Sequence, residues 1–311
     1  MQTLTTLAKI SDRIDMLSKN CVDRKVPVHD IRFDSLNTVR IAGQPYRMRH
    51  MAQQGFSFRL NVPLYYLRRC PIDVQAYNLN HWIEKERNEE LFVRFDGDDV
   101  RAVFTERYVP VDNFEVLEKL DSLGYSPDTE VQCSVDQDFM MLSIPDGKKT
   151  FTINGNKMSP GISISNSEVG IASLSISAYV LRLICSNGLI SEEKESQKYK
   201  HISRKILDEF PEVLSKVSYH LAEQKEKFKL SLESPVADPL STITLFNRQF
   251  QLSKEEQEAV TWAWPFEVGE TMFQIVNTYT KASQYENLPS ASVNKLQKTG
   301  GNILNMVGGV N

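Results

Sequence analysis

The sequence predicts an α+β fold with a central antiparallel sheet, flanking helices and a mostly helical C-terminal third. Three observations support this prediction. Short alternating apolar runs are separated by turn residues over much of the first half. The stretch from Gly161 to Gly188 then holds two apolar, strand-like runs around polar residues. After Gly188 the chain is charged, with apolar residues at helical spacing. We expect four segments: an N-terminal helix or arm (1–36), an α+β core (37–190), a helical region (191–289) and a flexible tail (290–311).

The first third of the chain predicts helices around one hairpin. Residues 1–24 place apolar side chains on one helical face, and residues 38–41 and 45–48 are expected to pair across Ala42 and Gly43. A helix is expected over 51–60. Pro63 begins a shorter helix that Pro71 ends, and Asp73 is expected to cap a third helix.

The clearest local signal is a pair of alternating runs, 91–95 and 100–104, around the turn-rich tetrad 96–99. We interpret the three aspartates of that tetrad as turn residues. A calcium loop has a glycine at its sixth position and a glutamate further along, and both are missing here. Asp112 and Glu115 predict a capping box at the start of the next helix. Strands are expected over 130–135, 139–144 and 151–153.

Gly161 to Gly188 contains a polar group between its apolar runs. Periodicity allows either two strands or a strand and a buried helix. The small hydroxyl and amide side chains either bond their own main chain or contact a ligand or partner. The polar residues in question are Ser165, Asn166, Ser167, Glu168 and Asn187.

Beyond Gly188, apolar residues three to seven apart from Ile202 to Phe228 predict charged helices with a buried stripe. Ser253 and Glu256 predict another capping box, and a last helix is expected over 267–281. Residues from 290 onward are small, polar and glycine-rich, which predicts a loose tail.

Composition favours a soluble globular protein, since 41% of the residues are hydrophobic and 24% are charged. No apolar run approaches the roughly 20 residues that cross a bilayer. The N-terminus carries no cleavable leader pattern, so we expect a cytoplasmic protein. The four cysteines are far apart and the five histidines have no metal-ligand spacing. We therefore predict no metal and no cofactor.

The net charge of −4 conceals a local positive excess. Between residues 32 and 69 the sequence has seven arginines and one acid, Asp34, with six aromatic residues interleaved. Guanidinium groups neutralise phosphates and aromatic faces stack on unpaired bases. The alternative is that the aromatic residues form core and the arginines lie at its rim.

Several segments together resemble a phage and plasmid-like family, domain of unknown function 932. They are VRAVFTERYVPVDN (100–113), MAQQ with NVPLYYLRRCP (within 51–71), the stretch from Ser163 to Ile190, VNTYTKAS (276–283) and LQKTGGNIL (296–304). The resemblance implies a mobile-element setting near recombination, replication or defence functions. It implies no reaction and no catalytic residues. A looser architectural likeness connects such a fold with phage single-strand annealing proteins.

The first functional hypothesis is an oligomeric protein, and no enzyme, that binds single-stranded DNA and anneals strands. The residues expected to contact DNA are Arg47, Arg49, Arg59, Arg68, Arg69, Tyr46, Phe56, Tyr65, Tyr66, Arg101 and Arg107. A second hypothesis is an interaction protein that blocks a host defence or repair enzyme through its charged helices. A third is a hydrolase or nuclease that uses Glu168 with Asp136 or Asp138.

Overall fold

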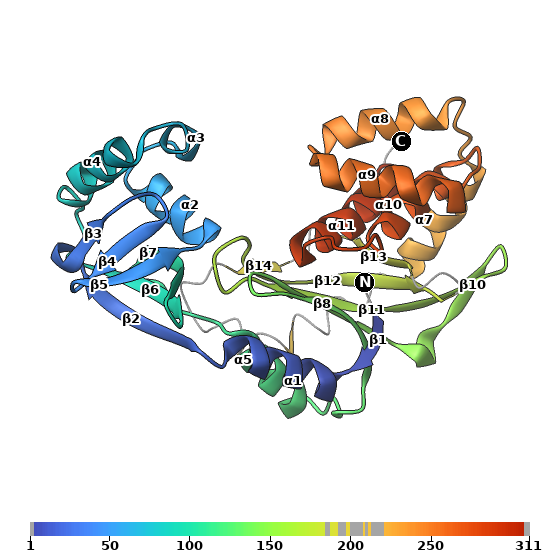
Figure 1. The fold of residues 1–311 in the computed structure, drawn as a ribbon. Helices are drawn as coiled ribbons and strands as arrows, with labels where there is room; N and C mark the ends of the chain where they lie inside the picture. The colour runs from blue at the N-terminus through green and yellow to red at the C-terminus, as the bar shows by residue number, and fades with distance from the viewer. Residues whose placement is uncertain are drawn as a thin grey trace.

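Two β-sheets organise the chain in the computed structural model, where the sequence analysis expected one central sheet (Figure 1). The structure describes residues 3–183, 187–191, 197–199, 208, 211–212 and 221–307. The predicted α+β class and the helical C-terminal third are confirmed. The expected 37–190 core divides between the sheets, because the chain leaves the first sheet at Thr105 and enters the second at Glu130.

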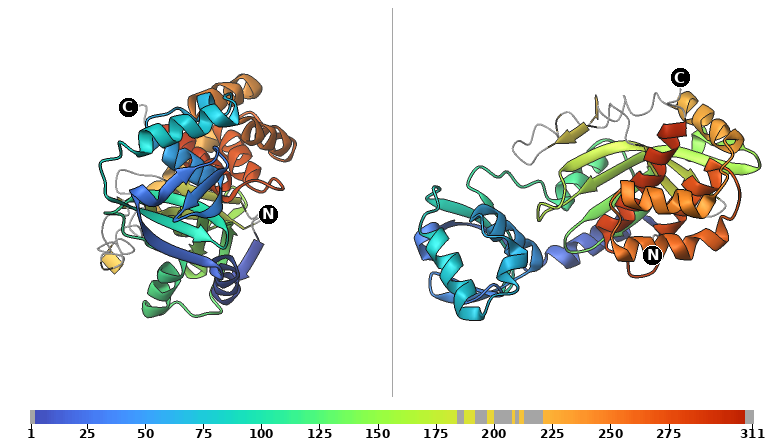
Figure 2. Two further views of the ribbon diagram at one scale, coloured as in Figure 1. Left: turned by 60° about the vertical axis from the view of Figure 1, so that its left-hand side comes forward. Right: turned by 90° about the horizontal axis from the view of Figure 1, so that it is seen from above.

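The first sheet has six strands in the order β2-β6-β7-β5-β4-β3, and its ladders are antiparallel except for the parallel pair β5 and β7. Three helices lie on one of its faces (Figures 1 and 2). The elements are β2 (Cys21–Pro27), β3 (Ile31–Phe33), β4 (Thr38–Ile41), β5 (Gln44–Met48), β6 (Glu90–Asp96), β7 (Asp99–Thr105), α2 (His50–Arg59), α3 (Leu64–Leu67) and α4 (Ile72–Ile83).

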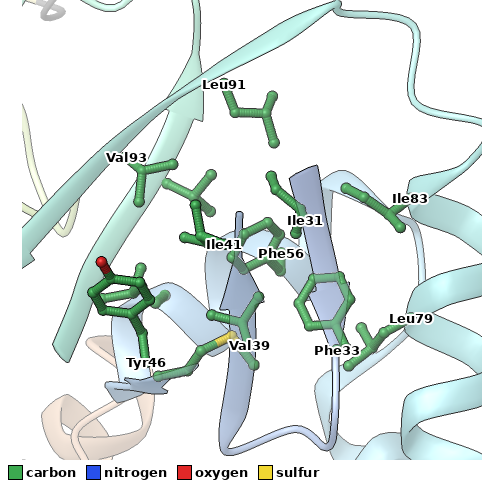
Figure 3. Close-up of a cluster of buried hydrophobic side chains, with 14 of the residues drawn as sticks. Ile31, Phe33, Val39, Ile41, Tyr46, Phe56, Leu79, Ile83, Leu91 and Val93 are labelled. Atoms are coloured by element: carbon green, nitrogen blue, oxygen red, sulfur yellow. The ribbon is translucent and has the colours of Figure 1, made fainter. Parts of the chain in front are cut away.

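The core of the first sheet lies between its strands and these helices (Figure 3). α2 packs closely on β7, because a Cβ atom at Gly55 would lie 2.9 Å from Cγ1 of Val103. α4 contributes Leu79 and Ile83, one turn apart, to the same core. Pro71 precedes α4 at its N-cap, where the sequence analysis expected Asp73.

The second sheet follows the path β1-β8-β9-β11-β12-β13, with β10 paired to β11 and β14 paired to β12. The stretch from Gly161 to Gly188 therefore supplies strands, and the alternative of a buried helix is wrong within the described residues. The strands are β1 (Thr3–Thr6), β8 (Glu130–Val135), β9 (Met140–Pro145), β10 (Phe151–Ile153), β11 (Asn156–Asn166), β12 (Leu174–Arg182), β13 (Asn187–Ser191) and β14 (Gln197–Tyr199).

Helices cover both faces of the second sheet: α1 and α5 lie on one face, and the C-terminal helices lie on the other (Figure 1). Strand alternation divides β11 between these layers, because Ile162 and Ile164 join the α1 and α5 core while Ser163 and Ser165 face away from it. The helices are α1 (Leu7–Ser18), α5 (Asn113–Ser122), α7 (Leu221–Glu233), α8 (Pro239–Gln249), α9 (Lys254–Ala263), α10 (Met272–Ala282) and α11 (Ser290–Val307).

The predicted capping boxes at Asp112 and Ser253 are confirmed at the starts of α5 and α9. The N-terminal arm differs from the prediction, because α1 is shorter than expected and lies between strands of the two sheets. Of the apolar stripe from Ile202 to Phe228, Phe228 is buried in α7 and the members between 202 and 220 lie outside the described residues.

The tail that was expected to be flexible from residue 290 is the helix α11, buried against the second sheet. Its glycines permit close packing: a Cβ atom at Gly301 would overlap the carbonyl oxygen of Ile190 in β13. The small residues that predicted looseness instead let the helix approach the strands. Among the described residues, no helix is long and apolar enough to span a bilayer.

Candidate nucleic-acid interface

Two of the predicted stacking rings lie in the core of the first sheet. Tyr46 is 8% exposed and Phe56 is 1% exposed. Phe56 packs edge-on against Phe33 with 5.0 Å between ring centroids (Figure 3). The Tyr46 and Phe95 ring centroids are also 5.0 Å apart. Successive side chains of β5 point to opposite faces of the sheet, and Tyr46 is on the inward side. Phe56 lies on the apolar face that α2 turns to β7, so its ring also points inward. The predicted contact of Tyr46 and Phe56 with DNA is therefore wrong.

Most arginines of the positive segment are paired with carboxylates, and all of these carboxylates except Asp34 come from other parts of the sequence. The predicted excess of charge is therefore largely offset in the folded chain. The pairs are Arg32 with Glu84 at 2.9 Å, Arg40 with Asp34 at 2.9 Å, Arg47 with Asp99 at 2.7 Å, Arg49 with Asp96 at 2.6 Å, and Arg59 with Glu86 at 3.4 Å.

Arg47 and Arg49 share the carboxylate of Asp99 at the start of β7. Nε and Nη2 of Arg47 donate to the two Asp99 oxygens at 2.8 and 2.7 Å, and Nε of Arg49 donates to Oδ2 at 2.8 Å. The hydrogen bond from Arg47 is the largest cause of a lowered pKa of Asp99. Asp96 also accepts from Arg49. These two arginines, predicted to bind phosphate, are thus committed to carboxylates at the β6–β7 turn.

Arg101 was expected to extend the binding surface, but its side chain is only 4% exposed. It donates to Sγ of Cys21 at 3.1 Å, to the carbonyl oxygen of Gln137 at 2.7 Å and to Oε2 of Glu168 at 3.2 Å. The position of Arg101 inside the junction between the sheets contradicts the prediction. Arg107, in the chain that follows β7, is exposed.

The polar residues at the end of β11 and just after it make structural contacts. Asn166 donates to the carbonyl oxygen of Val111 and to Oδ1 of Asn113, both at 2.9 Å. Ser165 hydrogen-bonds with Ser175 at 2.8 Å, and Ser167 donates to the carbonyl oxygen of Asp138 at 2.8 Å. The partners are 10 to 55 positions away in the sequence, so these side chains join separate segments of the fold. The sequence analysis expected either bonds to their own main chain or contact with a ligand or partner. The side chain of Asn187 lies outside the described residues.

Glu168 joins α5 to the first sheet. Oε1 accepts a hydrogen bond from the backbone N–H of Asn113 at 2.9 Å, and Oε2 faces Arg101. Arg94 donates to the Glu168 carbonyl oxygen at 3.0 Å and is paired with Asp23 and Asp112. Burial tends to lower the pKa of Arg94, but Asp112 and Asp23 outweigh it and raise that pKa.

The hydrolase hypothesis placed Glu168 beside Asp136 or Asp138. Glu168 and Asp136 line one cavity of only about 10 Å³, which leaves no room for a scissile group. Asp136 accepts from the backbone N–H groups of Asp138, Phe139 and Ser290. Burial raises the pKa of Asp138. Among the described residues, no group of three His, Cys, Asp or Glu side chains is placed to bind a metal.

The four remaining predicted residues lie together on and just after the short helix α3. Tyr65 is 72% exposed, Tyr66 is 43% exposed, and Arg68 and Arg69 are exposed in the turn that follows. Arg68 hydrogen-bonds with Nδ1 of His50 at 2.9 Å. Within the described chain, neither arginine forms an ion pair with a carboxylate.

Helix α4 continues this arrangement with residues that the sequence analysis did not identify. The Tyr77 and His81 rings are stacked with 6.1 Å between centroids. Lys85, just after the helix, lies 2.9 Å from Nε2 of His81, and its ammonium is 4.8 Å from the centre of the Trp82 ring. Nε2 of Gln75 in α4 donates to the carbonyl oxygen of Cys70 at 3.0 Å, which joins α4 to the turn that follows α3.

The spacing of α4 contained the signal for these residues. Leu79 and Ile83 are buried one turn apart, so positions 77, 81 and 85 fall about 200° away, on the opposite face of the helix. We call the combined area the α3–α4 surface. It consists of Tyr65, Tyr66, Arg68, Arg69, Tyr77, His81, Trp82 and Lys85.

A sequence model of the family described as "Domain of unknown function (DUF932)" matches residues 100–297. This range begins in β7 and covers the second sheet except β1, together with most of the helices on it. The α3–α4 surface lies before the matched range. No curated protein and no solved structure matches the chain.

Proposed function

The chain belongs to the DUF932 family, whose description specifies no activity, and from the α3–α4 surface we propose that it binds single-stranded DNA. The observation that supports this proposal is the exposure of Tyr65 beside Arg68 and Arg69. An exposed ring next to cations with no carboxylate partner among the described residues offers both contacts that an unpaired strand requires.

The chemistry of the surface favours a single strand over a duplex. Tyrosine and tryptophan faces stack on bases only when the bases are unpaired, and each stacked base contributes about 1–3 kcal/mol. A duplex offers its phosphates but keeps its bases stacked on one another. The segment from Leu60 to Lys85, which spans the surface, contains two acids, Asp73 and Glu84, and Glu84 is paired with Arg32. The surface therefore presents little unpaired negative charge to a polynucleotide.

Fluorescence anisotropy with a labelled oligodeoxythymidine tests the proposal, using a strand longer than the roughly 4–16 nucleotides that one such surface covers. Tyr65→Ala is expected to weaken binding by about 1–3 kcal/mol through loss of one stacked base. The double variant R68Q/R69Q is expected to reduce the slope of log affinity against log salt by about 1.4, at about 0.7 per phosphate contact.

Two variants serve as matched controls. Arg13 is exposed on α1 and Leu240 is 60% exposed on α8, both on elements that pack with the second sheet. Arg13→Gln removes one charge and Leu240→Ala removes one apolar side chain, and neither is expected to change the affinity. The proposal fails if wild-type protein shows no binding at low salt, or if the α3–α4 variants bind like the controls.

A finer proposal is that the protein acts as a homo-oligomer that anneals strands during phage or plasmid recombination or replication. It depends on single-strand binding and on the mobile-element setting that the family resemblance implies. Particle mass in solution with and without the oligonucleotide tests it. A small particle of constant mass would contradict annealing by an oligomer. The alternative of a host-enzyme blocker depends on the charged stretch after Gly188, and the described residues add no observation in its favour.

A further inference from the structure

A groove of about 1130 Å³ lies beside the α3–α4 surface. It is formed by α2 and the loop that follows, the end of β7 with residues 105–108, and the turn at Val169 and Gly170. Pro63, the N-cap residue of α3, lines its edge, so the groove adjoins the helix that carries Tyr65. Its volume suffices for a nucleotide-sized ligand, for which pockets of about 300–1,000 Å³ are typical.

Arg59 presents an incompletely bonded guanidinium to this groove. Its Nε atom is buried without a hydrogen-bond partner, and its one carboxylate contact, to Oε2 of Glu86, is long at 3.4 Å. The other oxygen of Glu86 accepts from Arg87 and Asn88. Burial acts to raise the pKa of Glu86, but these hydrogen bonds and Arg59 lower it. A buried, unsatisfied donor beside an open groove favours an acceptor supplied by an anionic ligand.

Arg107 adds a second cation to the same lining. It is exposed, and within the described chain it forms no ion pair. Two guanidinium groups against the single carboxylate of Glu86 leave the lining positive. Guanidinium groups match the oxygens of a phosphate with paired hydrogen bonds.

Aromatic rings complete the lining. Phe104 and Tyr108, which both line the groove, are stacked with 3.8 Å between centroids and an interplanar angle of 5°. Phe58 is 88% exposed at the rim, so the face of its ring is open to solvent. A ligand that combines a planar ring with a phosphate would contact the aromatic rings and the guanidinium groups of the groove together.

We propose that this groove binds one nucleoside monophosphate unit, with its phosphate at Arg59 and Arg107 and its base against Phe58. The occupant is either a free nucleotide or one nucleotide of a bound strand. In the second case the inference rests on the proposed function, because the strand would continue from the α3–α4 surface past Pro63 into the groove.

Titration calorimetry with deoxythymidine monophosphate and with the oligodeoxythymidine distinguishes a free nucleotide from a bound strand as the occupant. Arg107→Gln and Phe58→Ala each change an exposed side chain, so both variants are expected to fold. Each is expected to weaken binding at the groove at least about tenfold, which corresponds to 1.4 kcal/mol. R59Q serves as a third variant, with circular dichroism to confirm its fold. The controls are Arg13→Gln and Phe266→Ala, which remove an exposed charge and an exposed ring outside both sites.

Binding of the mononucleotide that is weakened by the groove variants and not by the controls supports the proposal with a free nucleotide as occupant. Oligonucleotide binding that is weakened by the same variants, with no mononucleotide binding, supports it with the strand as occupant. If the groove variants bind both probes like wild type, the inference is overturned, and the proposed function stands as long as Tyr65→Ala weakens oligonucleotide binding. Mononucleotide binding without oligonucleotide binding overturns the proposed function and leaves the groove assignment intact.

Discussion

Arg101 of β7 and Glu168 after β11 form a buried ion pair that joins the two sheets, with 3.2 Å between Nη2 and Oε2. Their side chains are 4% and 11% exposed. The pair is held on both sides: Arg101 also donates to Gln137, and Glu168 accepts from the N–H of Asn113 at the start of α5. Glu168, one of the polar residues that the sequence analysis singled out, therefore holds the second sheet and α5 against the first sheet.

Replacement of Glu168 by alanine is expected to destabilise the protein by about 3–5 kcal/mol, because it leaves the Arg101 guanidinium buried without its carboxylate. The free energy of unfolding in urea measures this loss. Glu168→Gln keeps an oxygen for the Asn113 N–H and is expected to cost less. A Glu168→Ala protein as stable as wild type would contradict a structural role. The hydrolase hypothesis instead requires a stable variant that has lost a cleavage activity.

Gly170 is required at the turn that rests on Phe104. Its φ is +88°, and a Cβ atom there would lie 2.8 Å from Cε1 of the Phe104 ring. Gly170→Ala is expected to lower the free energy of unfolding by about 1–2 kcal/mol for the backbone conformation and by about 1–3 kcal/mol more for the overlap.

Gly43 supplies the matched control, because its φ is +82° and a Cβ atom there would meet nothing within 4 Å. Gly43→Ala is expected to show the conformational cost alone. Phe104→Leu in the Gly170→Ala background is expected to recover part of the loss, which a double-mutant cycle measures. Equal losses in the two alanine variants would show that the ring contact does not constrain the turn.

Local elements of this fold could be predicted from the sequence because their signals are contained in a few adjacent residues. The hairpin of β6 and β7 follows from two alternating runs around a turn, and the capping boxes at Asp112 and Ser253 each need only a span of four residues. Alternation of apolar and polar residues identifies a strand, but it does not specify which strands far apart in the sequence pair with one another. The division into two sheets was therefore missed.

The candidate site was predicted only in part, for a related reason. Arg47 and Arg49 lie in a segment with one acid, but the fold brings Asp96 and Asp99 to them from about 50 positions away. Tyr46 and Tyr65 belong to the same basic segment, but Tyr46 is buried and Tyr65 is exposed. Charge counts along a chain do not include neutralisation by distant residues. Arg68 and Arg69 are exposed and have no carboxylate partner among the described residues, so at this turn the charge counted along the sequence persists in the fold.

Replacement of Gly301 in α11 by alanine is expected to destabilise the protein, whereas the same replacement in most helices stabilises it. Gly→Ala in a helix interior ordinarily stabilises by about 0.5–1 kcal/mol. At Gly301 the new Cβ atom would overlap backbone atoms of Ile190 in β13, which cannot rotate away. Gly301→Ala is therefore expected to destabilise the protein by about 1–3 kcal/mol or more. Thermal unfolding checks this, with the exposed Met306→Ala as a control expected within about 0.5 kcal/mol of wild type. A rise in stability would show that α11 does not pack closely on the sheet.

Asp99 provides a prediction for the dependence of stability on pH. Hydrogen bonds from Arg47 and Arg49 lower the pKa of this carboxyl below its ordinary value of 3.8 in the folded protein. A lowered folded-state pKa means that the ionised carboxylate stabilises the fold. This contribution is complete above the ordinary value and is lost as the pH falls through the folded-state value.

Wild type is therefore expected to exceed Asp99→Asn in free energy of unfolding by about 1.5–3 kcal/mol at neutral pH, the range for a hydrogen bond with a charged partner. The difference is expected to shrink once the pH falls below 3.8 and to vanish well below it. Asp98 lies in the same turn with an exposed side chain, so Asp98→Asn should show a small difference that changes little with pH. Urea unfolding of the three proteins over a series of acidic pH values measures these curves. A constant difference between wild type and Asp99→Asn across that series would mean that the ion pairs with Arg47 and Arg49 are not its source, because only ionisation of Asp99 makes their contribution depend on pH.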